Sequence, residues 1–180
     1  MSTASPHQVD FSLPGLIGAI LVPGLGHFLR GEKRRAAMIA TSILGLFFGG
    51  ILIGGIDAID SREDPFWFYG QALVGPLAFG VDYLHQNQFK VVEQTTSPNG
   101  KVVVKRRSAR PDEGRDPKTN APTPLQAGAK PPNIKGLAKV NEIGTLFATI
   151  GGMLNVIVVL DAALAPRGRA RRDNPMEPHA

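Results

Sequence analysis

The uninterrupted apolar stretch from Ala36 to Ile56 constrains this chain more than any other feature of its sequence. Its residues, AAMIATSILGLFFGGILIGGI, include no charged side chain. As an α-helix the stretch would extend about 31 Å, which matches the hydrocarbon thickness of a bilayer. A soluble core helix is normally apolar on one face only, and this stretch is apolar on all sides. The sequence therefore predicts a transmembrane helix at this position.

Three further apolar blocks predict additional membrane helices: residues 13–29, 66–84 and 143–165. Pro23-Gly24 predicts that the first helix ends near Val22 and bends, with the sequence PGLGHF at the membrane interface. Pro76 predicts a kink in block 66–84, whose first residues, PFWFY, fit an interfacial aromatic belt. The predicted fold class is an all-α membrane protein with three to four transmembrane helices. Because no Lys or Arg precedes block 13–29, we do not expect it to be a cleaved signal peptide, and whether it fully spans stays open.

The predicted organisation has four parts: an N-terminal membrane region 1–84, a polar basic segment 85–141, a C-terminal transmembrane helix 142–165 and a basic tail 166–180. Within the polar segment, two β-type runs flank the turn sequence SPNG, which predicts a small hairpin. Residues 108–132 are rich in Pro and poor in large apolar side chains. We therefore expect segment 85–141 to be largely disordered.

The distribution of charge predicts the partners and the orientation. The formal net charge is +5, and the cations lie beside the apolar blocks, which favours anionic lipid headgroups over nucleic acid. Loop 30–35 holds four Lys and Arg residues and segment 85–141 holds eleven, whereas loop 57–65 holds one Arg and four carboxylates. The positive-inside rule then places loop 30–35 and segment 85–141 in the cytoplasm, so that the tail arginines fall outside, against the same rule.

Glycines at spacings of four or eight predict where helices pack. Small residues allow helix backbones to approach closely in a membrane. The candidate packing positions are Gly45, Gly49, Gly50, Gly54, Gly144 and Gly152. Such faces could serve contacts within the chain, or between copies or with other proteins in a homo- or hetero-oligomer.

Four polar residues in or near the apolar blocks are candidates for function: His27, Asp82, Asn155 and Asp161. Polar groups are costly at membrane depth and tend to mark function there. Each also has a structural explanation, because His27, Asp82 and Asp161 lie near block ends and Asn155 can bind across a helix interface. The sequence contains no recognisable catalytic or phosphate-binding motif and no cysteine. We therefore predict no catalytic residue, no metal site and no cofactor.

Two stretches resemble known families. The sequence VPGLGHFLRGEKRRA, residues 22–36, resembles the Pro-Gly-x-Gly-x-Phe-x-x-Gly turn of the two-transmembrane-domain family and related small bacterial membrane proteins. The sequence NEIGTLFATIGGMLNVIVVLDA, residues 141–162, is similar to the end of an uncharacterised bacterial multi-span family. The first resemblance implies a short apolar helix, a glycine-rich turn and a basic residue that lead into a full span. Neither resemblance implies a reaction.

Two functional hypotheses follow. The preferred one is an integral membrane protein of structural or interaction role, which is not an enzyme and which associates through helix packing and basic segments. The alternative is a component of a small-solute or ion transporter or channel that uses His27, Asp82 and Asn155.

Overall fold

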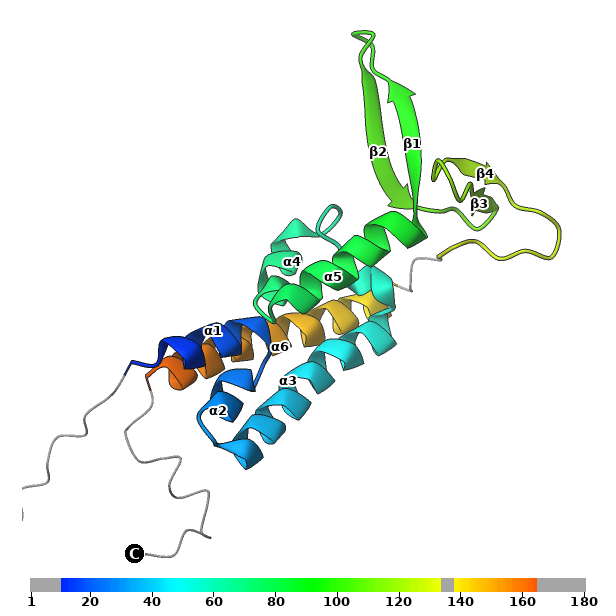
Figure 1. Ribbon diagram of the computed structural model, residues 1–180. Coiled ribbons are helices and arrows are strands. Elements are labelled where there is room, and N and C mark those ends of the chain that lie inside the picture. Colours follow the sequence, from blue (N-terminus) through cyan, green and yellow to red (C-terminus); the bar gives the residue numbers. More distant parts are fainter. Residues whose placement is uncertain (1–10, 134–137, 165–180) are drawn as a thin grey trace, which may run out of the picture.

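Two long antiparallel helices form the frame of the molecule. The computed structural model describes residues 11–133 and 138–164, which are mostly helical. Helix α3 (Lys33–Gly54) and helix α6 (Ala138–Ala163) lie side by side along most of their length (Figure 1). Within the described part of the chain, these two helices are long and apolar enough to cross a membrane. The predicted span 36–56 and the predicted C-terminal helix 142–165 thus correspond to α3 and α6.

The two long helices touch where glycines remove the side chains. A Cβ atom added at Gly50 would lie 2.5 Å from the carbonyl oxygen of Gly144, and one added at Gly54 would lie 3.1 Å from the Gly144 Cα. A Cβ atom at Gly152 would lie 2.0 Å from the carbonyl oxygen of Gly70 on the neighbouring helix α4. By contrast, Gly45 and Gly49 have no described atom within 4 Å of the same position. Four of the six candidate glycines therefore lie at backbone contacts, and two face open space.

The first apolar block folds back on itself instead of crossing. Helix α1 (Leu13–Leu21) is followed by a sharp bend and by helix α2 (Leu25–Leu29). The bend requires glycine, because Gly24 has a φ of 86° and a Cβ there would lie 2.5 Å from the Ala36 carbonyl oxygen. The predicted break therefore occurs, and the chain turns beside α3. The position of PGLGHF at the membrane interface stays a prediction.

The third apolar block also forms a hairpin, made of α4 (Pro65–Ala72) and α5 (Pro76–Leu84). Gly75 lies between them with a φ of 111°, and Pro76 begins the second helix. Both ends of the hairpin return to one short segment, because the Asp64 amide donates to the Asp60 carbonyl and His85 Nδ1 lies 3.0 Å from the Ile59 carbonyl. The prediction of one kinked span over 66–84 is therefore wrong, and a total of three to four spans is not confirmed.

The tips of the two hairpins meet beside the middle of α6. A Cβ atom on Gly75 would lie 2.5 Å from the Ile20 carbonyl oxygen at the end of α1. The α1–α2 hairpin begins at the C-terminal end of α6, where the Ser12 amide donates to the Ala163 carbonyl over 2.8 Å. The α4–α5 hairpin begins at the other end of the bundle (Figure 1). The two hairpins thus enter the helical layer from opposite ends.

A β region follows α5. After the short helical turn η2 (His85–Phe89), strand β1 (Lys90–Thr96) pairs antiparallel with β2 (Val102–Ser108), so the predicted small hairpin is confirmed. This β1–β2 arm projects away from the helices (Figure 1). Strands β3 (Glu113–Arg115) and β4 (Pro122–Pro124) form a second small sheet. The expectation of a largely disordered segment is therefore wrong for residues 85–124. This segment has too few large apolar side chains to form a core of its own, and strand pairing and ion pairs order it instead.

The arrangement of the hairpins bears on the predicted orientation. Loop 30–35 lies at one end of the α3–α6 frame, and segment 85–133 leaves from the other end (Figure 1). The two cannot lie on the same side if α3 and α6 cross a membrane. The predicted orientation treated block 66–84 as a membrane crossing. In the structure, this block is a hairpin, and both of its ends lie beside residues 59–60, at the C-terminal end of α3. The tail arginines, which follow α6, and residues 1–10 lie outside the described residues.

Candidate functional site

The helices bury several polar side chains beside a small apolar core, and they expose many large apolar side chains. His27, Gln71, His85 and Asn155 are fully buried, as is Phe47 in the apolar core. Large apolar side chains are exposed on every α-helix, and Leu52 on α3 is 86% exposed. Only 22% of the apolar stretch of α3 and 39% of that of α6 are buried within the protein. The helices of a water-soluble protein normally turn their apolar side chains toward the core.

One polar cluster, here called the latch, joins the α1–α2 hairpin to the C-terminal end of α6. It consists of His27, Glu32, Arg35 and Asp161. His27 Nε2 lies 2.7 Å from Asp161 Oδ2, and Arg35 Nη2 lies 2.5 Å from the same oxygen. Glu32 is fully buried, and its carboxylate lies 3.5 Å from Arg35. The latch therefore fixes the turn before α3 against the last turn of α6.

Arg30 adds a helix cap to the latch. Its guanidinium donates to the Ala162 carbonyl over 3.0 Å and lies 3.8 Å from Glu32. A cation at this position satisfies carbonyls that the end of α6 leaves free, and it interacts favourably with the helix dipole. The two stretches that resemble known families, residues 22–36 and 141–162, thus meet through His27, Arg30 and Asp161.

Asn155 lies at the middle of the molecule and binds both hairpins. Its side-chain amide donates to the Leu73 carbonyl over 2.9 Å and to the Ala19 carbonyl over 3.4 Å. These carbonyls belong to the ends of α4 and α1, where the helix breaks leave backbone acceptors without intrahelical donors. The partner that the sequence required for Asn155 is therefore the backbone of two interrupted helices.

A second polar cluster, here called the acidic cluster, lies at the opposite end. It consists of Asp57, Asp60, Asp82, His85 and Lys90. Lys90 is fully buried and its ammonium binds Asp60, while Glu63 lies 2.9 Å from the same nitrogen. Asp82 accepts from the Ser61 amide and hydroxyl at 2.8 and 2.6 Å. The cluster joins the loop after α3 to the end of α5 and the start of β1.

Asp60 is the most constrained carboxylate of the acidic cluster. Burial alone would raise its pKa, but the Lys90 ammonium and the backbone amides of Glu63 and Arg62 outweigh burial and lower the pKa. The Gln86 side chain donates to the same carboxylate over 2.8 Å. Asp60 is thus an ionised anchor at neutral pH.

Asp57, Asp60 and His85 could present ligand atoms to a metal ion. One such atom from each residue lies within 4.8 Å of the others, and all three residues are buried. His85 Nδ1 faces the Ile59 carbonyl, and Nε2 lies 3.3 Å from Asp57 Oδ1. However, the Lys90 ammonium already binds Asp60. The chain therefore supplies its own cation to this cluster, and we do not assign it to a metal.

The candidate residues do not form one site. His27 and Asp161 meet in the latch, Asp82 lies in the acidic cluster, and Asn155 lies between the two. The sequence analysis did not identify three buried charged residues, because each lies in a polar segment that resembles an ordinary surface loop: Lys90, Glu32 and Asp60. A carboxylate inside the basic run RGEKRR is the one sequence signal that could have indicated Glu32.

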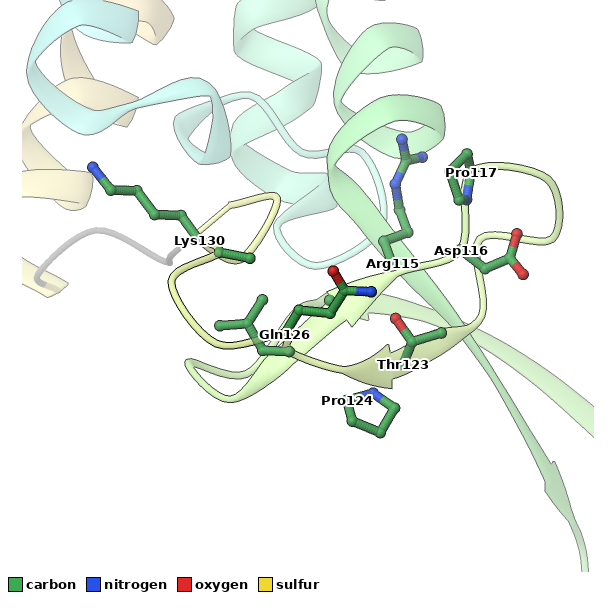
Figure 2. A pocket seen from close by; sticks show the side chains of 10 residues that line it. Arg115, Asp116, Pro117, Thr123, Pro124, Gln126 and Lys130 are labelled. Carbon is green, nitrogen blue, oxygen red and sulfur yellow. The ribbon is translucent and has the colours of Figure 1, made fainter.

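A wide groove lies outside the helices, beside strands β3 and β4 (Figure 2). It has a volume of about 580 Å³, and Arg115, Asp116, Thr123, Gln126 and Lys130 are among its lining residues. Arg115 is already bound, because its guanidinium donates to the Asn87 carbonyl over 2.7 Å and to Asn120 Oδ1 over 2.6 Å. Arg115 therefore attaches the second sheet to η2, the turn after α5, and is not free to recognise an anion.

Arg107 holds the two small sheets together, and this contact predicts an unusual titration. Its guanidinium pairs with both oxygens of Glu113 at 2.7 and 3.0 Å and with Glu93 at 2.7 Å. The Arg107 hydrogen bond, followed by the Arg110 backbone amide, lowers the pKa of Glu113 to about 2.

We expect the Glu113 carboxyl to titrate near pH 2 in a carbon-detected NMR measurement. In the Arg107→Gln variant the midpoint should rise toward 4.5 without reaching it, because the Arg110 backbone amide still donates to Glu113. A carboxylate with a lowered pKa stabilises the fold at pH values above its unfolded pKa. The contribution of Glu113 is thus complete above about 4.5 and is lost as the pH falls through about 2. A midpoint near 4.5 in the unmodified protein would contradict the ion pair.

Comparison with known proteins gives a family but no activity. Residues 15–174 match a protein family described as a family of unknown function (DUF6677). No curated protein and no solved structure matches the chain.

Proposed function

We propose a function for this chain from its own geometry, because it belongs to a family of unknown function (DUF6677). The proposal is an integral protein of the cell membrane with a structural or interaction role that is not enzymatic. Helices α3 and α6 cross the bilayer in opposite directions, and the α1–α2 and α4–α5 hairpins enter it from opposite faces. The frame then holds the β1–β2 arm on one side of the membrane and the basic loop 30–35 on the other.

The exposed apolar surface of the two long helices is the observation that supports this proposal. Four side chains of these helices are at least 60% exposed, although both helices are long and apolar enough to cross a membrane: Leu52, Met38, Ile157 and Met153. In water, a contiguous surface of this kind would promote aggregation. In a bilayer, lipid tails cover it, and buried polar groups such as the Asn155 amide and the Gln71 amide donate to backbone carbonyls inside the protein.

The charges favour one orientation over the other. The positive-inside rule counts cations within about 20 residues of a span end in the sequence. Before α3 and after α6, the sequence has four cations in loop 30–35 and four arginines at positions 167, 169, 171 and 172. After α3 and around the start of α6, it has Arg62 and four lysines, at positions 118, 130, 135 and 139, and loop 57–64 also has four carboxylates. We propose that loop 30–35 and the tail are cytoplasmic, and that the β1–β2 arm is outside. This arrangement also removes the conflict over the tail.

Association is the proposed use of the remaining helix surface. The face of α3 that carries Gly45 and Gly49 has no described neighbour within 4 Å of either glycine. A helix of a second copy or of another membrane protein could approach closely there.

The absence of cysteine from the chain allows a direct test of the topology. We expect Ser97→Cys, in the turn of the β1–β2 arm, to react in intact cells with a maleimide that cannot cross the membrane. Arg34→Cys should react only after the membrane is permeabilised. The unmodified chain is the control, since it has no thiol to react. Equal labelling of both variants in intact cells would contradict the proposed arrangement.

A further inference from the structure

A second, apolar groove lies between the α1–α2 hairpin and the first turns of α3. It has a volume of about 300 Å³ and is lined by residues 22–25 and Phe28 of the hairpin and by Ala36, Ala37 and Ala40 of α3. The groove exists because α3 presents small side chains to the bend, where Gly24 approaches the backbone of Ala36 and Ala40. Its lining is apolar except for Lys33 at one end.

The cations at the start of α3 divide into two kinds. Arg30 and Arg35 are engaged by Glu32 and Asp161 in and around the latch. Lys33 and Arg34 are exposed, and they make no salt bridge with any residue in the ranges 11–133 and 138–164. Neutralising partners for these two cations must therefore come from outside the described chain or from solvent.

The start of α3 adds backbone donors to the same place. The Lys33 amide already donates to the Gly31 carbonyl over 3.0 Å, so the amides left for a ligand are those of Arg34 and Arg35. Glu32 occupies the N-cap position, but its side chain accepts no hydrogen bond from the first amides of the helix. The first amides of a helix point outward and carry a partial positive charge, which favours a phosphate group. Two free cations, a helix N-terminus and the open end of an apolar groove thus coincide.

We propose that this groove is a specific site for an anionic phospholipid. One acyl chain lies in the groove between the hairpin and α3, and the headgroup phosphate binds the Lys33 and Arg34 side chains and the backbone amides of Arg34 and Arg35. The site rests on the proposed membrane function, because it places Lys33 at the level of the headgroups and the groove in the hydrocarbon. It goes beyond that function by naming one lipid class and one position.

The geometry separates this site from general contact with lipid. Other apolar surface of α3, such as that around Leu52, is exposed, but α3 carries no Lys or Arg after Arg35. Electrostatic attraction to anionic lipid is worth about 1 kcal/mol for each Lys or Arg near the surface. Two free cations therefore predict a preference of about tenfold or more for an anionic headgroup over a zwitterionic one.

Native mass spectrometry of the full chain in detergent micelles tests the proposal. The chain is titrated with phosphatidylglycerol and with phosphatidylcholine that carry identical acyl chains. We expect one phosphatidylglycerol molecule to remain bound at about tenfold lower concentration than phosphatidylcholine. Glycerol phosphate, which lacks acyl chains, should not displace it, because the groove contributes to binding.

Two variants and two matched controls locate the site. The Lys33→Gln/Arg34→Gln variant should lose the headgroup preference, whereas Lys101→Gln/Lys118→Gln, with the same charge change in the β region, should keep it. Ala37→Phe fills the groove and should weaken phosphatidylglycerol binding, whereas Thr41→Phe, on α3 outside the groove, should not.

Equal binding of the two lipids, or a preference that persists in Lys33→Gln/Arg34→Gln, would overturn the lipid site. Displacement by glycerol phosphate would also overturn it, in favour of a simple anion site. None of these results would affect the membrane proposal, which is tested separately by maleimide labelling at positions 34 and 97.

Discussion

Replacing Gly50 by leucine is expected to separate α3 from α6, whereas the same replacement at the adjacent Gly49 is expected to be tolerated. A Cβ atom at Gly50 would lie 2.5 Å from the Gly144 carbonyl oxygen and 2.9 Å from the Ala148 nitrogen. Both neighbours are backbone atoms, so the clash can be relieved only by movement of a whole helix. At Gly49 no atom of the described chain lies within 4 Å of the same position.

The expected cost for Gly50→Leu is about 3 kcal/mol or more of the free energy of unfolding. Thermal unfolding in detergent micelles, followed by circular dichroism, measures it. Gly49→Leu is the matched control, because it changes the same residue type one position away and affects helix propensity in the same way. Similar melting temperatures for the two variants would contradict the described packing of α3 on α6.

The glycine pairs illustrate what sequence could and could not predict about the helix contacts. Spacing of four residues identifies both the Gly45–Gly49 face and the Gly50–Gly54 face of α3 as candidates. Only tertiary structure separates them, because the choice depends on where α6 lies. The face opposite Gly144 is used within the chain, and the Gly45–Gly49 face is left for a contact with another molecule or with lipid.

The hairpins show a different limit of the sequence. Pro23-Gly24 and Gly75-Pro76 indicate that both short blocks are interrupted, and the structure has breaks at both places. A break of this kind is compatible with a kinked span or with a reversal. The φ values of 86° at Gly24 and 111° at Gly75 produce reversals, and no residue pattern within either block distinguishes these from a kink.

That local difference changes the orientation that the charges predict. With block 66–84 as a crossing, loop 30–35 and segment 85–141 are predicted on one side. With the same block as a hairpin, and with α3 and α6 as the two crossings that we propose, loop 30–35 and segment 85–133 fall on opposite sides. The sequence identifies His27 and Asp161 as separate candidates but does not predict that they meet in the latch. The two residues lie 2.7 Å apart in space and far apart in the sequence.

Substitution of Asn155 is the second change for which we expect a large effect. The relative stability of two variants, Asn155→Leu and Asn155→Asp, tests its role. Asn155→Leu keeps the size of the side chain and removes the donors to the Leu73 and Ala19 carbonyls. Two buried acceptors then lack a partner, which costs about 1–3 kcal/mol each. Asn155→Asp keeps the shape but places a carboxylate against the same two carbonyl oxygens, and an uncompensated buried charge costs about 3–5 kcal/mol.

We therefore expect stability to fall from the unmodified protein to Asn155→Leu and further to Asn155→Asp, measured by unfolding in micelles. Hydrogen exchange should show where the loss occurs. Amides near the hairpin tips, residues 20–25 and 73–77, should exchange faster in Asn155→Leu, because the amide of Asn155 joins both tips to α6. Amides in β1 and β2 should not change, since the β1–β2 arm projects away from the helices (Figure 1). Faster exchange throughout the chain would indicate a general loss of packing, and unchanged exchange at the tips would show that the two helix ends are satisfied without Asn155.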